Sequence, residues 1–132
     1  MLYELVVPTA TTTEFVNITS KVKDCVLKSG VQNGICYVYV PHTTAGLTIN
    51  ENADPDVVHD MLKVLNKVIP FDDRYLHMEG NSAAHIKASL MGFSQHLIIS
   101  NGRLLLGTWQ GIYFTEFDGP RRRKAYVKII EG

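Results

Sequence analysis

The sequence predicts an α+β domain, in which helices pack on one side of a mostly antiparallel sheet. Strand-like segments dominate both ends of the chain, and helix-like periodicity occupies the middle. Asn101-Gly102 lies between two apolar runs and favours an antiparallel hairpin, because both turn positions require positive φ. The length of 132 residues fits one domain, residues 1–132.

The N-terminal part of the chain reads as two strands followed by a helix. The strands are expected over residues 2–8 and 14–19. A capping serine, three apolar residues at helical spacing and a terminating glycine define the helix: Ser20, Val22, Cys25, Val26 and Gly30.

The same order of elements follows once more. Residues 34–40 and 47–50 are predicted strands. Asp54 can then cap a helix, because its side chain can accept backbone N–H bonds, and Pro55 suits the first helical position. The helix ends before Pro70 and carries one apolar stripe: Val57, Val58, Met61, Leu62 and Leu65.

The C-terminal half is expected to begin with a polar loop and a short helix. The loop covers residues 71–81, and the helix covers residues 82–91 with Ile86 and Leu90 directed inward. Four strands then form two predicted hairpins: residues 96–100 with 104–106, and residues 111–117 with 124–130 across Asp118-Gly119-Pro120.

Composition and charge restrict the class of partner. Lys plus Arg and Asp plus Glu both number 13, and a net charge of zero argues against binding to nucleic acid or an anionic membrane. Cys25 and Cys36 occupy apolar positions typical of buried free thiols. The start of the chain lacks a secretory signal, and no apolar run approaches the ~20 residues of a membrane span. A cytoplasmic location is therefore expected.

Polar residues that could carry chemistry fall into three clusters. They are His42, Thr43 and Thr44 with Glu51 and Asn52 shortly after; His77, Glu79 and His85 around a loop-to-helix junction; and Trp109 and Gln110 between glycines, with Arg121, Arg122 and Arg123 downstream. Unpaired polar groups are costly to bury, so each cluster is either a surface edge or a site.

The histidines raise the hypothesis of a metal site. Imidazole is the commonest zinc ligand, and a catalytic site needs about three protein ligands plus an open position. His42, His77 and His85 lie in loops or at element ends, where side chains can converge. Their spacing matches no tight metal motif, so hydrogen-bonded structural histidines are the alternative. His59 lies off the apolar stripe of its helix and is expected at the surface or in an interface.

Phosphate binding is the second hypothesis. A helix that begins at Ser82 presents free N–H groups and a positive dipole end, with Lys87 one turn further along. Arg121 and Arg123 could bind phosphate oxygens in a fork, and strand alternation directs Arg122 to the opposite side. A solvated basic turn is the alternative for this run.

Residues 94–102 and 107–112, with Gly107-Thr108-Trp109-Gln110 at their centre, resemble the signature of the YjbQ family of secondary thiamine-phosphate synthases. The resemblance covers roughly residues 1–131. It extends upstream through these segments: His42-Thr43-Thr44-Ala45, Asn50-Glu51-Asn52, the helix from Asp54-Pro55, Glu79-Gly80 and His85-Ile86-Lys87.

The resemblance implies a sheet curled toward a barrel or sandwich with about three helices, a homotrimer, and a divalent metal ion, zinc or magnesium. It also implies a low activity that joins a pyrimidine diphosphate to a thiazole phosphate. Carried over by position, His42, His77 and His85 would hold metal or an anion. The expected catalytic residues are His85, Glu51, Asn52, Glu79 and Gln110. The expected phosphate contacts are Thr43, Thr44, Ser82, Lys87, Arg121 and Arg123, and the role of the two arginines rests on their chemistry rather than on the resemblance.

Two other functions remain open from the sequence. One is a trimer that binds a metal or a small phosphorylated metabolite without turnover. The other is a metal-dependent hydrolase of phosphate esters, in which metal-bound water attacks the phosphoryl group.

Overall fold

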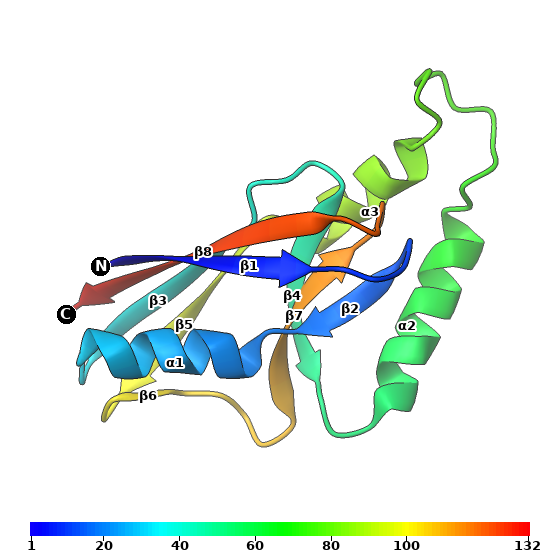
Figure 1. The fold of residues 1–132 in the computed structure, drawn as a ribbon. Helices are drawn as coiled ribbons and strands as arrows, with labels where there is room; N and C mark the ends of the chain where they lie inside the picture. The colour runs from blue at the N-terminus through cyan, green and yellow to red at the C-terminus, as the bar shows by residue number, and fades with distance from the viewer.

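The computed structural model describes residues 1–132, which fold into eight strands and three helices (Figure 1). In chain order the elements are β1 (Leu2–Pro8), β2 (Glu14–Asn17), α1 (Thr19–Ser29), β3 (Gly34–Tyr39), β4 (Ala45–Glu51), α2 (Pro55–Val68), α3 (Ser82–Met91), β5 (Ser94–Ser100), β6 (Arg103–Leu104), β7 (Gln110–Glu116) and β8 (Arg122–Glu131). This order confirms the predicted α+β class.

The strands form two antiparallel sheets that together curl into a half-barrel. The larger sheet has the order β1-β8-β3-β5-β6, and the smaller one has the order β2-β7-β4. Helix α1 contacts β6, β7 and β8, whereas α3 lies on β4 and β7. In Figure 1, α2 stands at the side of the molecule, next to β2 and away from the larger sheet.

The main core lies inside the curl, between the two sheets and α1. It contains the inward side chains of alternating strand residues, such as Cys36 and Val38 of β3 and Val127 of β8. Both cysteines are free and buried, as predicted. A second, small cluster joins Phe117 to Ala84 and Ala88 of α3.

Several local predictions are confirmed in detail. The Asp54 side chain accepts a hydrogen bond from the Asp56 N–H at 2.9 Å, and Pro55 occupies the first turn of α2. Asn101 and Gly102 both adopt positive φ between β5 and β6. The start of α1 differs, because Asn17 rather than Ser20 is the side chain that accepts the N–H of Thr19 there.

The predicted second hairpin, residues 111–117 with 124–130, is wrong. β7 pairs with β2 and β4, whereas β8 pairs with β1 and β3. A two-residue turn such as Asn101-Gly102 keeps two strands in one ladder, but the connection over residues 117–121 is long enough to change sheets. β7 is the central strand of its sheet and is buried from Gly111 to Glu116.

The expected orientation of α3 is also wrong. Ile86 and Leu90 are 41% and 64% exposed. The residues that α3 buries are Ala83, Ala84, Lys87 and Ala88. The helix approaches β4 closely, since a Cβ on Gly46 would lie 2.7 Å from the carbonyl oxygen of Gly92. Small side chains permit this approach, so the alanine face is the one that packs.

The apolar stripe of α2 is the more buried side of the helix: its five residues are half-buried, whereas His59 is exposed. No residue of this helix is fully buried, and Leu65 makes partial contact with the cluster around Phe117. Neither α2 nor any other helix has the combined length and apolar character that crossing a bilayer requires.

Burial of Cys36 makes the free energy of unfolding depend on pH. Burial, and then the neighbouring Cys25, raises the pKa of the Cys36 thiol from 9.0 to about 12. The unfolded chain therefore loses this proton first as pH rises, and stability falls between about pH 9 and pH 12 by up to about 1.4 kcal/mol per pH unit.

Chemical denaturation of the wild type and Cys36→Ala across this range measures the difference. The wild type should lose stability more steeply than the variant, although the variant starts lower because it leaves a small cavity. Parallel pH profiles for the two proteins would contradict the assignment.

Candidate functional site

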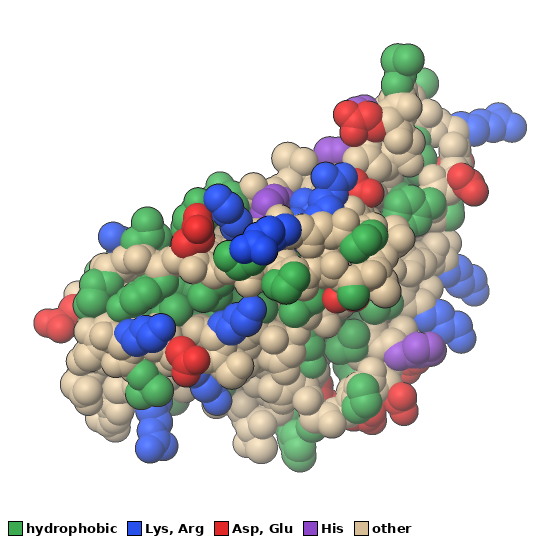
Figure 2. Space-filling view, viewed as in Figure 1, with side chains coloured by type: hydrophobic (Ala, Val, Ile, Leu, Met, Phe, Trp, Pro, Cys, Tyr) green, Lys and Arg blue, Asp and Glu red, His purple; other side chains and the backbone are tan.

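A polar cavity of about 420 Å³ lies where the loop before β4, the start of α3 and the start of β8 meet. Apart from Pro41, the residues that line it are polar or charged: His42, Thr43, Thr44, His77, Glu79, Asn81, His85, Arg121 and Arg123. Figure 2 shows histidine and basic side chains gathered on this upper edge of the molecule, over α3 and the start of β8. The two sequence clusters around His42 and His85 are therefore brought together.

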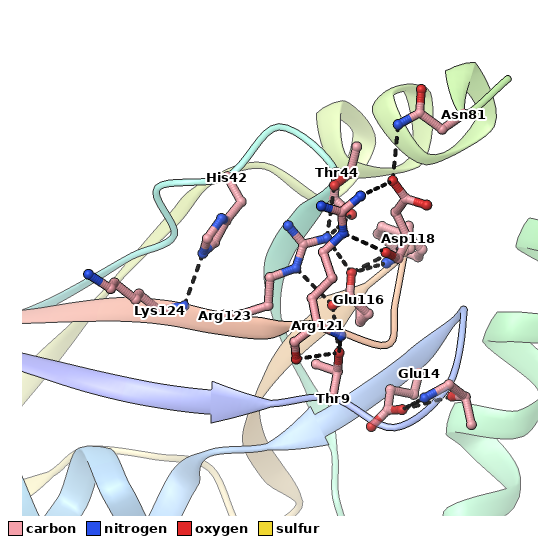
Figure 3. A network of polar contacts seen from close by, with 12 residues as sticks. Thr9, Glu14, His42, Thr44, Asn81, Glu116, Asp118, Arg121, Arg123 and Lys124 are labelled. Carbon is pink, nitrogen blue, oxygen red and sulfur yellow. Dashed lines mark hydrogen bonds and ion pairs between the residues drawn. The ribbon is translucent and has the colours of Figure 1, made fainter. Parts of the chain in front are cut away.

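Arg123 forms the floor of the cavity and is almost completely buried. Its Nε donates to Oε1 of Glu116 at 2.8 Å, and its Nη2 donates to Oε2 of Glu116 and to Oγ1 of Thr44. Burial alone would raise the pKa of the Glu116 carboxyl, but bonds from Arg123, the Asp118 N–H and Thr9 lower it overall. The pair is therefore ionised and doubly hydrogen-bonded (Figure 3).

Arg121 is held in a similar way at the rim. Its Nε donates to the carbonyl oxygen of Asp118, and its Nη2 donates to Oδ2 of Asp118, both at 2.9 Å. Nδ2 of Asn81 donates to the same carboxylate oxygen at 3.0 Å. The buried Oδ1 of Asn81 has no hydrogen-bond partner within the chain and can accept a bond from a ligand donor.

His42 is fixed by the backbone of β8. Its Nε2 accepts the N–H of Lys124 at 3.0 Å, so the neutral ring carries its proton on Nδ1. Burial, and then the charge of Arg123, lowers the pKa of His42 below its ordinary value of 6.5. The ring is thus a neutral Nδ1–H donor at the cavity wall.

The three histidines do not fit a metal centre in this arrangement. His77 and His85 face each other edge to face, with ring centroids 5.4 Å apart. No three His, Cys, Asp or Glu side chains are grouped so that they could hold a metal ion. Coordination by Nδ1 of His42 would also move its proton to Nε2, where it would oppose the Lys124 N–H. Apart from the Glu79 carboxylate, the charged and hydrogen-bonding groups of the lining suit an oxyanion better than a cation.

Two predicted phosphate contacts lie outside this cavity. Ser82 lines a neighbouring cavity that shares His77 and His85 with the first. Lys87 is fully buried; its Nζ donates to Oδ1 of Asn66 at 2.6 Å and lies 4.8 Å from the Phe71 ring centroid. Burial lowers the pKa of this amine, which points toward α2 rather than into the site.

Three predicted catalytic residues lie at the opposite end of the β4–β7 pair. In the β4–β7 pair, Ala45 lies opposite Glu116 at the cavity end, and Glu51 lies opposite Gln110 at the other end. Six residues of strand separate Glu51 from the cavity end, roughly 20 Å at 3.3 Å per residue. There the Asn52 N–H donates to Trp109, and the Gln110 side chain accepts the N–H of Gly107. Within one chain this group does not meet the histidines.

Sequence reasoning missed Asn81, Glu116 and Asp118. Asn81 and Asp118 look like ordinary loop residues, and only the fold shows that Arg121 joins them to the site. Glu116 carried a detectable signal, because a carboxylate ending the apolar run Ile112-Tyr113-Phe114 needs a buried partner. The inward position of Arg123 on the next strand could have supplied that partner.

The hydrogen bond to His42 predicts an unusual titration. At about pH 6, where most free histidine is protonated, a smaller fraction of the His42 ring should be protonated, because its folded-state pKa is lowered. Nitrogen-15 NMR of the ring should show a protonated Nδ1 and an unprotonated Nε2. A ring that charges together with free histidine, or that carries its proton on Nε2, would contradict this geometry.

The comparisons with known proteins agree with the resemblance seen in the sequence. The family model described as UPF0047 protein YjbQ-like matches residues 3–132. A UPF0047 protein of Methanocaldococcus jannaschii is 55% identical over 130 residues, covering 98% of this chain and 94% of the relative. YugU of Bacillus subtilis is 53% identical over 133 residues, covering 98% and 99%.

Two solved structures show the same fold. A YjbQ/UPF0047 protein of Clostridium acetobutylicum is 62% identical with a TM-score of 0.96, covering 97% of this chain and 99% of that one. A YbjQ-like protein of unknown function from Sulfolobus solfataricus reaches a TM-score of 0.96 at 33% identity, covering 100% and 97%. By sequence, fold and length, the chain belongs to the YjbQ/UPF0047 family.

Proposed function

We propose that the cavity binds the phosphoryl group of a small phosphorylated metabolite. The observation that carries this proposal is the convergence of two arginines and three histidines in a mainly polar cavity. Arginine offers planar N–H groups that match phosphate oxygens, and the hydroxyls of Thr43 and Thr44 lie in the same wall. Nδ1–H of His42 adds a neutral donor.

The reaction we propose is a secondary thiamine-phosphate synthase activity. In that reaction the carbon–oxygen bond of the pyrimidine diphosphate breaks, and pyrophosphate leaves with the electron pair. The ring nitrogen of the thiazole phosphate then donates its lone pair to form the new carbon–nitrogen bond. Both substrates carry phosphate, and hydrogen-bond donors aimed at the leaving group would stabilise its developing charge. The resemblance of residues 94–112 to the signature of secondary thiamine-phosphate synthases is the reason for this choice.

His85 is the residue to test, because it lines both the polar cavity and its neighbour. His85→Ala should lower thiamine-phosphate formation by about 10²-fold, the usual effect of removing one charge-stabilising donor. Chromatography of the product after oxidation to the fluorescent thiochrome measures turnover. His59→Ala is the matched control, since His59 is an exposed histidine of α2 outside the cavity.

Equal turnover in His85→Ala and the wild type would contradict the proposed reaction. Saturable binding of inorganic phosphate without any thiamine phosphate would instead favour a phosphometabolite-binding protein without turnover. Release of orthophosphate from a monoester, lost on chelation, would indicate the hydrolase.

We also propose that the chain forms a homotrimer through the outer face of the larger sheet. One isoleucine from each of β5, β3 and β8 lies side by side across this face, with Ile35 opposite both Ile98 and Ile130. All three are at least 40% exposed, and the exposed rings of Tyr37 and Tyr39 continue the patch. His96 and Lys128 flank Tyr37, and an exposed apolar row bordered by polar residues in this way marks an interaction surface.

Ile35→Lys should therefore dissociate the oligomer, because it places a charge at the centre of the buried face. Sedimentation velocity should show the wild type at three times the mass of a 14.8 kDa chain and the variant nearer one. Leu27→Lys is the control, because Leu27 is 70% exposed on α1. A monomeric wild type would refute the proposal.

A further inference from the structure

Glu116 is a fully buried carboxylate behind the cavity wall, and it has no direct part in the proposed function. Its Oε1 accepts bonds from Oγ1 of Thr9 and Nε of Arg123, both at 2.8 Å. Its Oε2 accepts from Nη2 of Arg123 and from the N–H groups of Phe117 and Asp118. Five donors thus saturate the carboxylate and leave it no capacity to bind a ligand.

The bonds to Glu116 leave one end of Arg123 free. A guanidinium has five N–H groups, and Glu116 and Thr44 take up those of Nε and Nη2. Nη1 makes no hydrogen bond within the chain, and Arg123 lines the polar cavity. Since the guanidinium is planar, fixing Nε and Nη2 also fixes the direction of Nη1.

We infer that Glu116 is a positioning residue that acts through Arg123. It orients the guanidinium so that the two N–H groups of Nη1 meet the oxygens of a bound phosphoryl group. This inference rests on the proposed phosphate binding. A donor held in place before binding loses less conformational entropy when the ligand arrives. Glu116 also neutralises the buried charge, so directed hydrogen bonds rather than net charge select the ligand.

A purely structural role is the competing explanation. The Glu116–Arg123 pair joins the end of β7 to the start of β8, two strands that share no backbone ladder. Loss of the pair would then weaken the fold and affect phosphate binding only through general unfolding. The experiment must separate these two roles.

The test is a double-mutant cycle with inorganic phosphate as the probe. Phosphate is titrated by NMR into the wild type, Glu116→Gln, Arg123→Lys and the double variant, with thermal unfolding of each recorded. Loss of one charged hydrogen bond should weaken binding roughly tenfold in each single variant. If Glu116 acts through Arg123, the double variant should bind within about twofold of Arg123→Lys, because the two effects are not additive.

Glu14→Gln is the matched control. The Glu14 carboxylate accepts bonds from the N–H groups of Ala10 and Thr11 and from Oγ1 of Thr11, outside the cavity (Figure 3). Like Glu116→Gln, the Glu14→Gln substitution weakens several hydrogen bonds to one carboxylate. It should therefore lower stability without changing the affinity for phosphate.

Three results would overturn the inference: wild-type affinity in Glu116→Gln, wild-type affinity in Arg123→Lys, or effects of the two substitutions that multiply. Absence of phosphate binding by the wild type would instead refute the proposed function itself. If Glu116→Gln does not fold, Glu116→Asp replaces it in the cycle, because it keeps the charge but withdraws the carboxylate from Nε and Nη2 of Arg123. The same lack of additivity with Arg123→Lys is then required.

Discussion

The buried ion pair between Glu116 and Arg123 is the constraint on which the site depends. It lies where the chain passes from the smaller sheet to the larger one, and both partners are almost free of solvent. Removing one partner of such a pair typically costs 3–5 kcal/mol, because the other charge stays buried and uncompensated. The pair fixes the start of β8, and with it the positions of Arg121 and of the Lys124 N–H that holds His42.

The chemistry of the cavity follows from which atoms are already engaged. The accepting nitrogen of His42 is hydrogen-bonded to the backbone. Arg121 and Arg123 each donate some of their N–H groups to a carboxylate. The groups that remain include N–H and O–H donors, and two groups are acceptors, the unpaired Oδ1 of Asn81 and the Glu79 carboxylate. The donors favour an anionic ligand, and no three side chains of the lining are grouped as the ligands that a metal centre needs.

Local signals in the sequence predicted local structure well, and failed where tertiary packing decides. Asp54 with Pro55 and Asn101 with Gly102 act on their own backbone, so their effects could be predicted without the fold. The inward face of α3 could not be predicted in this way, because it depends on how closely Gly46 lets the helix approach β4. The pairing of β7 likewise depends on strands far away in the sequence. The histidines and arginines of the site could be named from sequence. The distance between these residues and Glu51 or Gln110 could not be predicted, because it follows from the register of β4 on β7.

The amine of Lys87 offers a way to observe motion of α2. No part of this side chain is open to solvent, and its bond to Asn66 lies beneath a helix that has no fully buried residue of its own. A helix so lightly anchored belongs to the part of a protein that opens locally without global unfolding. An acylating reagent can reach this nitrogen only after such an opening. The rate at which Lys87 becomes acylated therefore reports how often α2 detaches locally from the rest of the protein.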